Sequence, residues 1–139
     1  MPVELVLADG AVVRCTKMLR LLPGKRAVMQ GRWQGQSVLI KLMPDTASGR
    51  RNARRETTGH RLLRDAGIDT PDLLFAARSE DRGHVLGFAF VHDAQPLGAL
   101  WRERAERRAG IAAAALELLA RLHRRGCRHA DPHLDNFLL

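Results

Sequence analysis

The first 43 residues consist of short apolar runs, each broken by glycine or by charged residues. Turn signals separate them at Asp9-Gly10, Pro23-Gly24 and Gln34-Gly35. The turn at residues 23–26 could face a phosphate, but it lacks a GxGxxG pattern, so an ordinary hairpin is the favoured interpretation. The pattern predicts antiparallel strands joined by tight hairpins, in the runs Glu4–Leu7, Ala11–Cys15, Lys17–Leu22, Ala27–Trp33 and Ser37–Met43.

A helical pattern follows, from about Gly49 to Ala66. Polar side chains at residues 45–48 offer capping oxygens before it, and Gly67 is a typical helix stop. Pro71 then favours extended backbone before it. Two further strands are expected, joined by a charged turn, in the runs Asp72–Arg78 and His84–Val91.

Beyond a polar linker at residues 92–96, the apolar pattern becomes helical again. It predicts a short helix over Leu97–Arg104 and a longer one over Arg108–Arg125, which Gly126 ends. Residues spaced by three and four form one apolar stripe on the longer helix. The members of this stripe are Ile111, Ala115, Leu118, Leu119 and Leu122.

Together these elements predict an α+β chain in two parts. Residues 1–91 are expected to form a lobe of about five antiparallel strands and one helix. Residues 92–139 are expected to form a hinge and the start of a helical lobe. No internal repeat is visible in the sequence.

Composition places the chain among globular proteins of a reducing compartment. Hydrophobic residues make up 45% of the 139 residues, which excludes wholesale disorder. The two cysteines, Cys15 and Cys127, are isolated and lack metal-binding or secretory spacing. The N-terminus carries acidic residues without a basic lead, and the alanine-rich stretch at 109–120 is too short to span a bilayer. A cytoplasmic protein is therefore expected, and a monomer.

The formal net charge of +8 favours anionic partners such as nucleotide phosphates or an anionic membrane face. Much of this charge lies in the arginine-rich segments 50–55 and 102–108. The ordinary interpretation of such segments is a solvated helix surface. A peripheral contact with the inner face of the cell membrane stays open, whereas nucleic-acid binding is not expected because these segments lack interleaved aromatic residues.

The last segment of the chain carries a pattern typical of phosphoryl transfer. Asp131 and Asn136 stand five residues apart in a polar loop, and His129 precedes the aspartate by two. This is the spacing of a kinase catalytic loop, in which the aspartate accepts a hydroxyl proton and the asparagine binds a metal ion. Two other interpretations stay open. One is a polar turn before a strand, and the other is a metal site formed by the alternating residues His129, Asp131, His133 and Asp135.

Lys41 is the one charged residue of the run at 37–43. The two-residue period of a strand places it on the same face as Leu39 and Met43. A lysine in this position either extends off the edge of the sheet or pairs with a partly buried group.

Glu56 is the candidate partner. It is the only carboxylate in the expected helix before Asp65, and it shares a helix face with His60 and Leu63. Neutralisation by neighbouring arginines is the simpler interpretation of an isolated Glu56. Because Lys41 lies on a strand 15 residues upstream and the loop motif follows, a Lys41–Glu56 ion pair is the favoured prediction.

The whole chain resembles the N-terminal half of a protein-kinase-like fold. It looks most like the bacterial lipopolysaccharide core kinases, which phosphorylate heptose or Kdo sugars. The segment at residues 55–71, with its Ala66-Gly67-Ile68-Asp69-Thr70-Pro71 exit, is similar to the helix of that family. The loop at residues 129–136 is also similar to the HADPHPGN motif of UbiB-type kinases and to the HGDxHxxN motif of the aminoglycoside and choline kinases. The KxGQ helix characteristic of the UbiB group is absent.

This resemblance implies a role for each candidate residue, with ATP and Mg²⁺ as cofactors. Lys41 would bind the nucleotide phosphates and Glu56 would hold Lys41. Asp131 would be the catalytic base and Asn136 a Mg²⁺ ligand. The adenine would meet the backbone of Phe90, Val91, His92 and Asp93.

The resemblance implies an ATP-dependent kinase of a non-protein acceptor, a lipopolysaccharide core sugar or a lipid-linked relative of one. No glycine-rich loop is recognisable, and the sequence ends before the position of a DFG-type aspartate. The 139-residue chain is therefore expected to be either a fragment of a longer kinase or a decayed remnant of one, and not to turn over alone. A non-catalytic module that binds a nucleotide or another anion, and a UbiB-like atypical kinase, are the alternatives.

Overall fold

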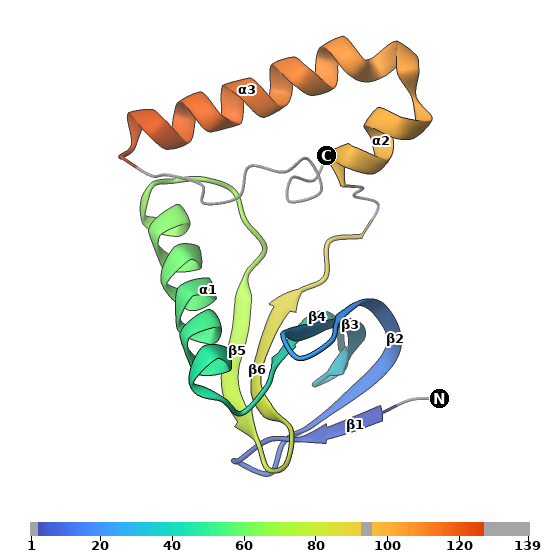
Figure 1. The fold of residues 1–139 in the computed structure, drawn as a ribbon, viewed down its shortest axis with the longest axis vertical. Coiled ribbons are helices and arrows are strands. Elements are labelled where there is room, and N and C mark those ends of the chain that lie inside the picture. Colours follow the sequence, from blue (N-terminus) through green and yellow to red (C-terminus); the bar gives the residue numbers. More distant parts are fainter. Residues whose placement is uncertain (1–2, 93–95, 127–139) are drawn as a thin grey trace. The chain divides into compact units, whose positions relative to one another are not determined.

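The computed structural model describes residues 3–92 and 96–126. These residues form an α+β fold, with three α-helices and a curled antiparallel sheet of six strands in the order β1-β2-β3-β4-β6-β5 (Figure 1). The chain divides into two compact units, one of residues 1–61 and 70–90 and the other of residues 62–69 and 91–139. The predicted lobe boundary after residue 91 lies one residue beyond the last residue of the first unit.

The six strands agree with the apolar runs of the sequence, apart from their number. Seven apolar runs were named and about five strands were expected, whereas six strands form because the runs at 11–15 and 17–22 make one long strand. Thr16 joins them, and its hydroxyl donates a hydrogen bond to the Gln30 carbonyl oxygen at 3.2 Å. The strands are β1 Val3–Val6, β2 Val12–Leu22, β3 Arg26–Trp33, β4 Gln36–Met43, β5 Leu73–Ser79 and β6 Gly83–Ala89.

The hairpin between β3 and β4 shows how local sequence sets the strand pairing. Gln34 and Gly35 both have positive φ, 48° and 79°. Two consecutive residues of this kind are typical of a type I′ turn, whose twist matches that of paired strands. The register that results places Trp33 opposite Gln36 and Val28 opposite Lys41.

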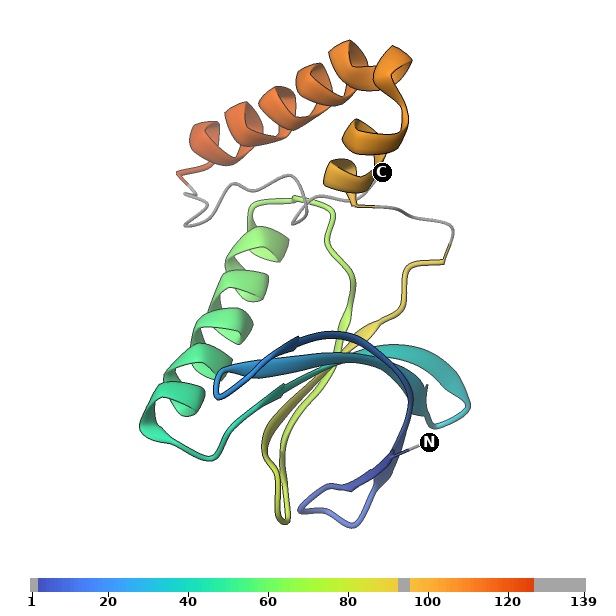
Figure 2. The same ribbon diagram turned by 45° about the vertical axis from the view of Figure 1, so that its right-hand side comes forward.

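The sheet curls on itself (Figure 2). Its inner face holds the larger apolar core of the first unit. Backbone hydrogen bonds close the curl between the end of β1 and the end of β5, from Ala8 N–H to Arg78 O at 2.8 Å and from Glu80 N–H to Val6 O at 3.0 Å. Burial raises the pKa of the Cys15 thiol, which belongs to this core. The buried members of the core are Leu5, Leu7, Val13, Cys15, Ala27, Met29, Val38, Ile40 and Val85.

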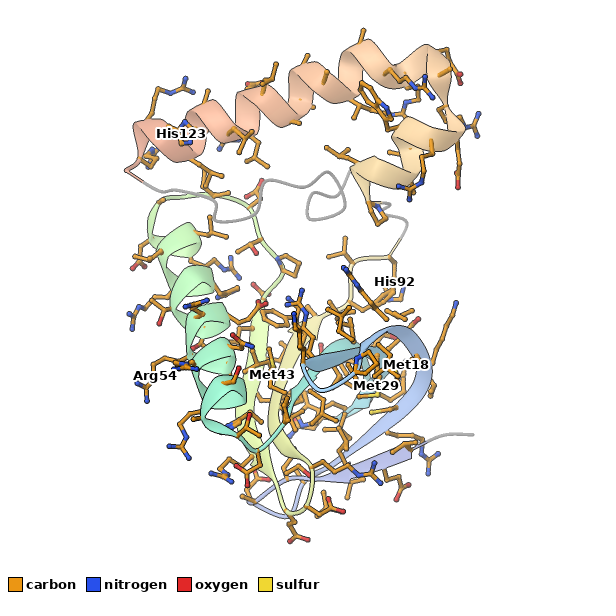
Figure 3. The ribbon with its side chains drawn as sticks, in the orientation of Figure 1. Met18, Met29, Met43, Arg54, His92 and His123 are labelled. Atoms are coloured by element: carbon orange, nitrogen blue, oxygen red, sulfur yellow. The ribbon has the colours of Figure 1, made fainter. Side chains whose placement is uncertain are left out.

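The other face of the sheet packs against α1 (Ala47–Asp65) through a second cluster. Ala53 of the helix lies against Met43, Leu86 and Phe88 of the sheet. In Figure 3, Met43 lies between the helix and the strands, whereas Arg54 points away from them. The arginines at 50, 51, 54 and 55 are exposed, as expected for a solvated helix surface.

The second unit contains α2 (Leu97–Glu103) and α3 (Arg108–Arg124), joined by a short 3₁₀ turn at Ala105–Arg107. Both helices lie where the sequence predicted them. The predicted stripe on α3 is confirmed, because Ile111, Ala115 and Leu122 are buried and the other two members are partly buried. Within residues 3–92 and 96–126, no helix has the length and apolar character needed to cross a lipid bilayer.

Two glycines of α1 should respond to alanine with opposite signs. A Cβ at Gly49 would overlap the Pro44 carbonyl oxygen, whereas a Cβ at Gly59 would meet no atom within 4 Å. Gly49→Ala should lower the free energy of unfolding by about 1–3 kcal/mol, as overpacking does. Gly59→Ala should raise it by about 0.5–1 kcal/mol, because alanine loses less backbone entropy in a helix. Urea unfolding of both variants measures the difference, and a shift of the same sign in both would contradict this packing.

Candidate anion-binding site

Lys41 lies in the interior of the sheet, because β4 pairs with β3 on one side and with β6 on the other. It shares the α1-facing side of the sheet with Leu39 and Met43, both of which pack in the second cluster. Its side chain is 22% exposed. A lysine at this position cannot extend off a strand edge, so its charge needs a partner on the helix side.

Glu56 is that partner, and the Lys41–Glu56 pair predicted from the sequence is present. Thr46 Oγ1 accepts a hydrogen bond from the Gly49 N–H at 3.0 Å, which caps the start of α1. Ala53 then packs on the sheet, and Glu56, one turn further along, faces the same way. Lys41 Nζ lies 3.0 Å from Glu56 Oε2.

The ring of Phe88 adds a second contact for the lysine. Lys41 Nζ lies 5.4 Å from the centroid of the Phe88 ring, a distance at which a cation interacts with the ring face. Phe88 is buried and belongs to the neighbouring strand β6. The ammonium group is therefore positioned from two directions, by a carboxylate and by an aromatic ring.

Arg26 is a third member of the site, and sequence analysis missed it. Its Nη1 lies 3.1 Å from Glu56 Oε1, so each oxygen of the carboxylate binds one cation. Sequence analysis placed Arg26 in the turn and started the strand at Ala27. Because β3 begins at Arg26, the residue shares a strand face with Val28, which pairs with Lys41. The two-residue period, begun one residue earlier, would have found it.

The three side chains leave an excess of positive charge. Arg26 and Lys41 carry two positive charges and Glu56 one negative charge, so the net charge is +1. The side chains are 35%, 22% and 26% exposed, respectively, which leaves each of them partly accessible to a ligand. Guanidinium and ammonium groups have five and three N–H donors, and one of each points at Glu56. The remaining donors suit the oxygens of a phosphate group.

His60 is a structural residue of α1 and not a member of this cluster. Its Nε2 lies 2.7 Å from the Pro71 carbonyl oxygen, which can only accept, so this nitrogen carries the proton. The ring lies 5.8 Å from that of Phe88. His60 therefore connects the helix to the segment that leads into β5.

The other predicted site residues are only partly covered by the structure. Phe90, Val91 and His92 come directly after β6, and the Phe90 N–H donates to the Ser37 carbonyl oxygen at 3.3 Å. Val91 is 41% exposed. Asp93, the candidate base Asp131 and the candidate metal ligand Asn136 lie outside the described residues. Among the residues that are described, no three His, Cys, Asp or Glu side chains group as a metal site would require.

Comparisons with known proteins do not assign a family or a function to this site. No protein-family model, no curated protein and no solved structure matches the chain. The interpretation of the site therefore rests on Lys41, Glu56 and Arg26 themselves.

Proposed function

We propose that this chain is the nucleotide-binding part of an ATP-dependent kinase that phosphorylates a non-protein acceptor, a lipopolysaccharide core sugar. One observation carries the proposal: a lysine in the interior of the sheet and a glutamate on the following helix meet at 3.0 Å. Kinases use such a pair to hold the phosphates of ATP, and phosphoryl transfer depends mainly on positioning and charge stabilisation.

The pair suits this role because the glutamate fixes the lysine without neutralising the site. Glu56 fixes the position of Lys41 Nζ, so little side-chain freedom is lost when a phosphate binds. Arg26 offsets the charge of Glu56, which keeps the cluster attractive to an anion. Val28 and Leu39, half-buried on the same face of the sheet, offer apolar surface beside Lys41.

Within this proposal, the remaining roles fall to residues outside the described part of the chain. Asp131 would accept the proton of the acceptor hydroxyl, and Asn136 would contribute an oxygen ligand to Mg²⁺. The metal ion would neutralise charge that develops on the transferred phosphate. The described residues would bind and orient the nucleotide at Lys41.

A non-catalytic anion-binding module is the second candidate function. The net charge of +1 at the cluster favours it, because anion binding there needs neither Asp131 nor Asn136. Because the 139-residue chain is not expected to turn over alone, the dependence of ATP binding on Mg²⁺ separates the two functions. ATP binding that Mg²⁺ strengthens and that Asn136→Ala weakens would support the kinase, whereas ATP binding that is indifferent to Mg²⁺ and to Asn136→Ala would support the module.

Chemical labelling of lysines tests nucleotide binding at this position. The chain has three lysines, Lys17, Lys25 and Lys41. An acyl phosphate derivative of ATP transfers its acyl group to a lysine amine that lies beside the bound phosphates. We expect Lys41 to react fastest, and excess ATP, but not excess adenosine, to suppress its labelling.

The internal controls make this result informative. Lys17 and Lys25 are exposed, whereas Lys41 is largely buried and ion-paired. A small acylating reagent without a nucleotide should therefore label Lys17 and Lys25 faster than Lys41. Nucleotide-directed labelling that follows the same order as this reagent, or that ATP does not suppress, would overturn the proposed function.

A further inference from the structure

Arg26 has a position that the Lys41–Glu56 pair does not explain. A single carboxylate already satisfies one cation, yet the structure places two on Glu56. We propose that Arg26 is a second phosphate-binding residue, which contacts the same polyphosphate ligand as Lys41. This inference rests on the proposed function and adds a residue and a specificity to it: a preference for ligands with two or more linked phosphates.

The sheet register brings the two cations together. Val28 of β3 pairs with Lys41 of β4, and Arg26 is two residues from Val28 on the same strand face. Both side chains reach toward α1 and contact opposite oxygens of Glu56. The guanidinium and the ammonium group are therefore separated by one carboxylate, a spacing that two neighbouring phosphates can also bridge.

The electrostatics of the cluster favour an anionic ligand over a closed structural ion pair. Two cations that share one carboxylate repel each other, and this repulsion is reduced when a second anion arrives. Arg26 is more exposed than Lys41, at 35% against 22%, so it is the more accessible of the two. Guanidinium is also the side-chain group that best matches the planar, two-point geometry of phosphate oxygens.

The β2–β3 hairpin fixes the position of Arg26 at the start of β3. Leu22 pairs with Arg26 across the hairpin, and the Lys25 N–H donates to the Leu22 carbonyl oxygen at 2.9 Å. Gly24 has a φ of 72°, a conformation that glycine adopts without strain. The short turn makes Arg26 the first residue of β3, so its side chain follows the alternation of the strand. Lys25, next to it, is exposed and serves as a matched control.

Titration of ATP, ADP and AMP into the 139-residue chain tests the inference. Arg26→Gln should weaken ATP and ADP binding by roughly ten- to hundredfold, as expected for the loss of a charge-assisted contact. The affinity for AMP should change by less than about threefold, because its single phosphate would contact Lys41 and not Arg26. Arg26→Lys should restore part of the affinity, and Lys25→Gln should leave all three affinities within about twofold.

A second background separates direct contact from an effect through Glu56. If Arg26 only positions Glu56, then Arg26→Gln should have no further effect in a Glu56→Gln chain. If Arg26 touches the phosphates, it should still weaken ATP binding there by about tenfold. Melting temperatures measured by circular dichroism confirm that each variant is folded before titration.

The outcomes distinguish this inference from the function on which it rests. If the wild-type chain binds none of the three nucleotides, the proposed function fails and the role of Arg26 fails with it. If the wild-type chain binds ATP and Lys41→Ala weakens it, but Arg26→Gln has no effect, the role of Arg26 alone is overturned. Equal losses for ATP and AMP would overturn the preference for linked phosphates.

Discussion

Ile40→Ala should lower the free energy of unfolding by about 2–5 kcal/mol, the range found for removal of a buried aliphatic side chain. Ile40 has 0% exposure and lies in the core of the curled sheet. Its side chain fills the space beside Gly31, where an added methyl group would overlap it. Because β-strands surround this position, the backbone cannot readily move inward to fill the cavity that alanine leaves.

Urea unfolding followed by circular dichroism measures the loss, with Leu21→Ala as the matched control. Leu21 is an aliphatic residue of the same sheet but is 58% exposed, so its truncation should cost less than about 0.5 kcal/mol. An equal decrease in the free energy of unfolding for Ile40→Ala and Leu21→Ala would contradict the placement of Ile40 in the core.

Local periodicity placed Lys41 and Glu56 on faces where they could meet, and the loop motif at residues 129–136 made their pairing the favoured prediction. The alternation of β4 places Lys41 on the face of Leu39 and Met43, and the helical repeat of α1 places Glu56 on the packed side of the helix. Both patterns depend on residues close in sequence. These patterns make the pair geometrically possible, and the choice of Glu56 over the edge of the sheet as the destination of Lys41 came from the loop motif.

The contribution of Arg26 could not be predicted in the same way. Its inclusion in β3 depends on the residue at which that strand begins, and strand ends are weakly marked when a turn contains charged residues such as Lys25 and Arg26. A strand taken to begin at Ala27 leaves Arg26 in the turn, without an assigned face. The order of strands is a second feature that periodicity does not contain. Nothing in the apolar pattern states that β6 lies between β4 and β5, or that β1 meets the end of β5.

The strand count shows a related effect. Residues 11–15 and 17–22 appear as two runs because Thr16 interrupts the apolar pattern between them. In the structure, the register of β2 shifts between Cys15 and Lys17 and again between Met18 and Arg20, and the strand continues. A β-bulge changes which residues face the core without ending the strand. In the sequence, a β-bulge that shifts the alternation of apolar and polar residues therefore looks like a turn between two strands.

Lys41→Ala should have the largest effect on ligand binding. The substitution removes a charge-assisted contact to phosphate, which contributes about 1.5–3 kcal/mol and corresponds to roughly ten- to hundredfold in affinity. It also removes one of the two cations that offset Glu56, so the carboxylate would repel an incoming phosphate more strongly. The fold should persist, because Glu56 keeps its contact with Arg26.

The most direct test of a nucleotide site at Lys41 is a calorimetric titration of ATP into the wild-type chain, Lys41→Ala and Lys25→Ala. Lys25→Ala removes the same charge from an exposed turn and serves as the control for net charge. We expect saturable binding to the wild-type chain, affinity within about twofold for Lys25→Ala, and a loss of at least about tenfold for Lys41→Ala. Equal affinity of the wild-type chain and Lys41→Ala for ATP would contradict a nucleotide site at Lys41.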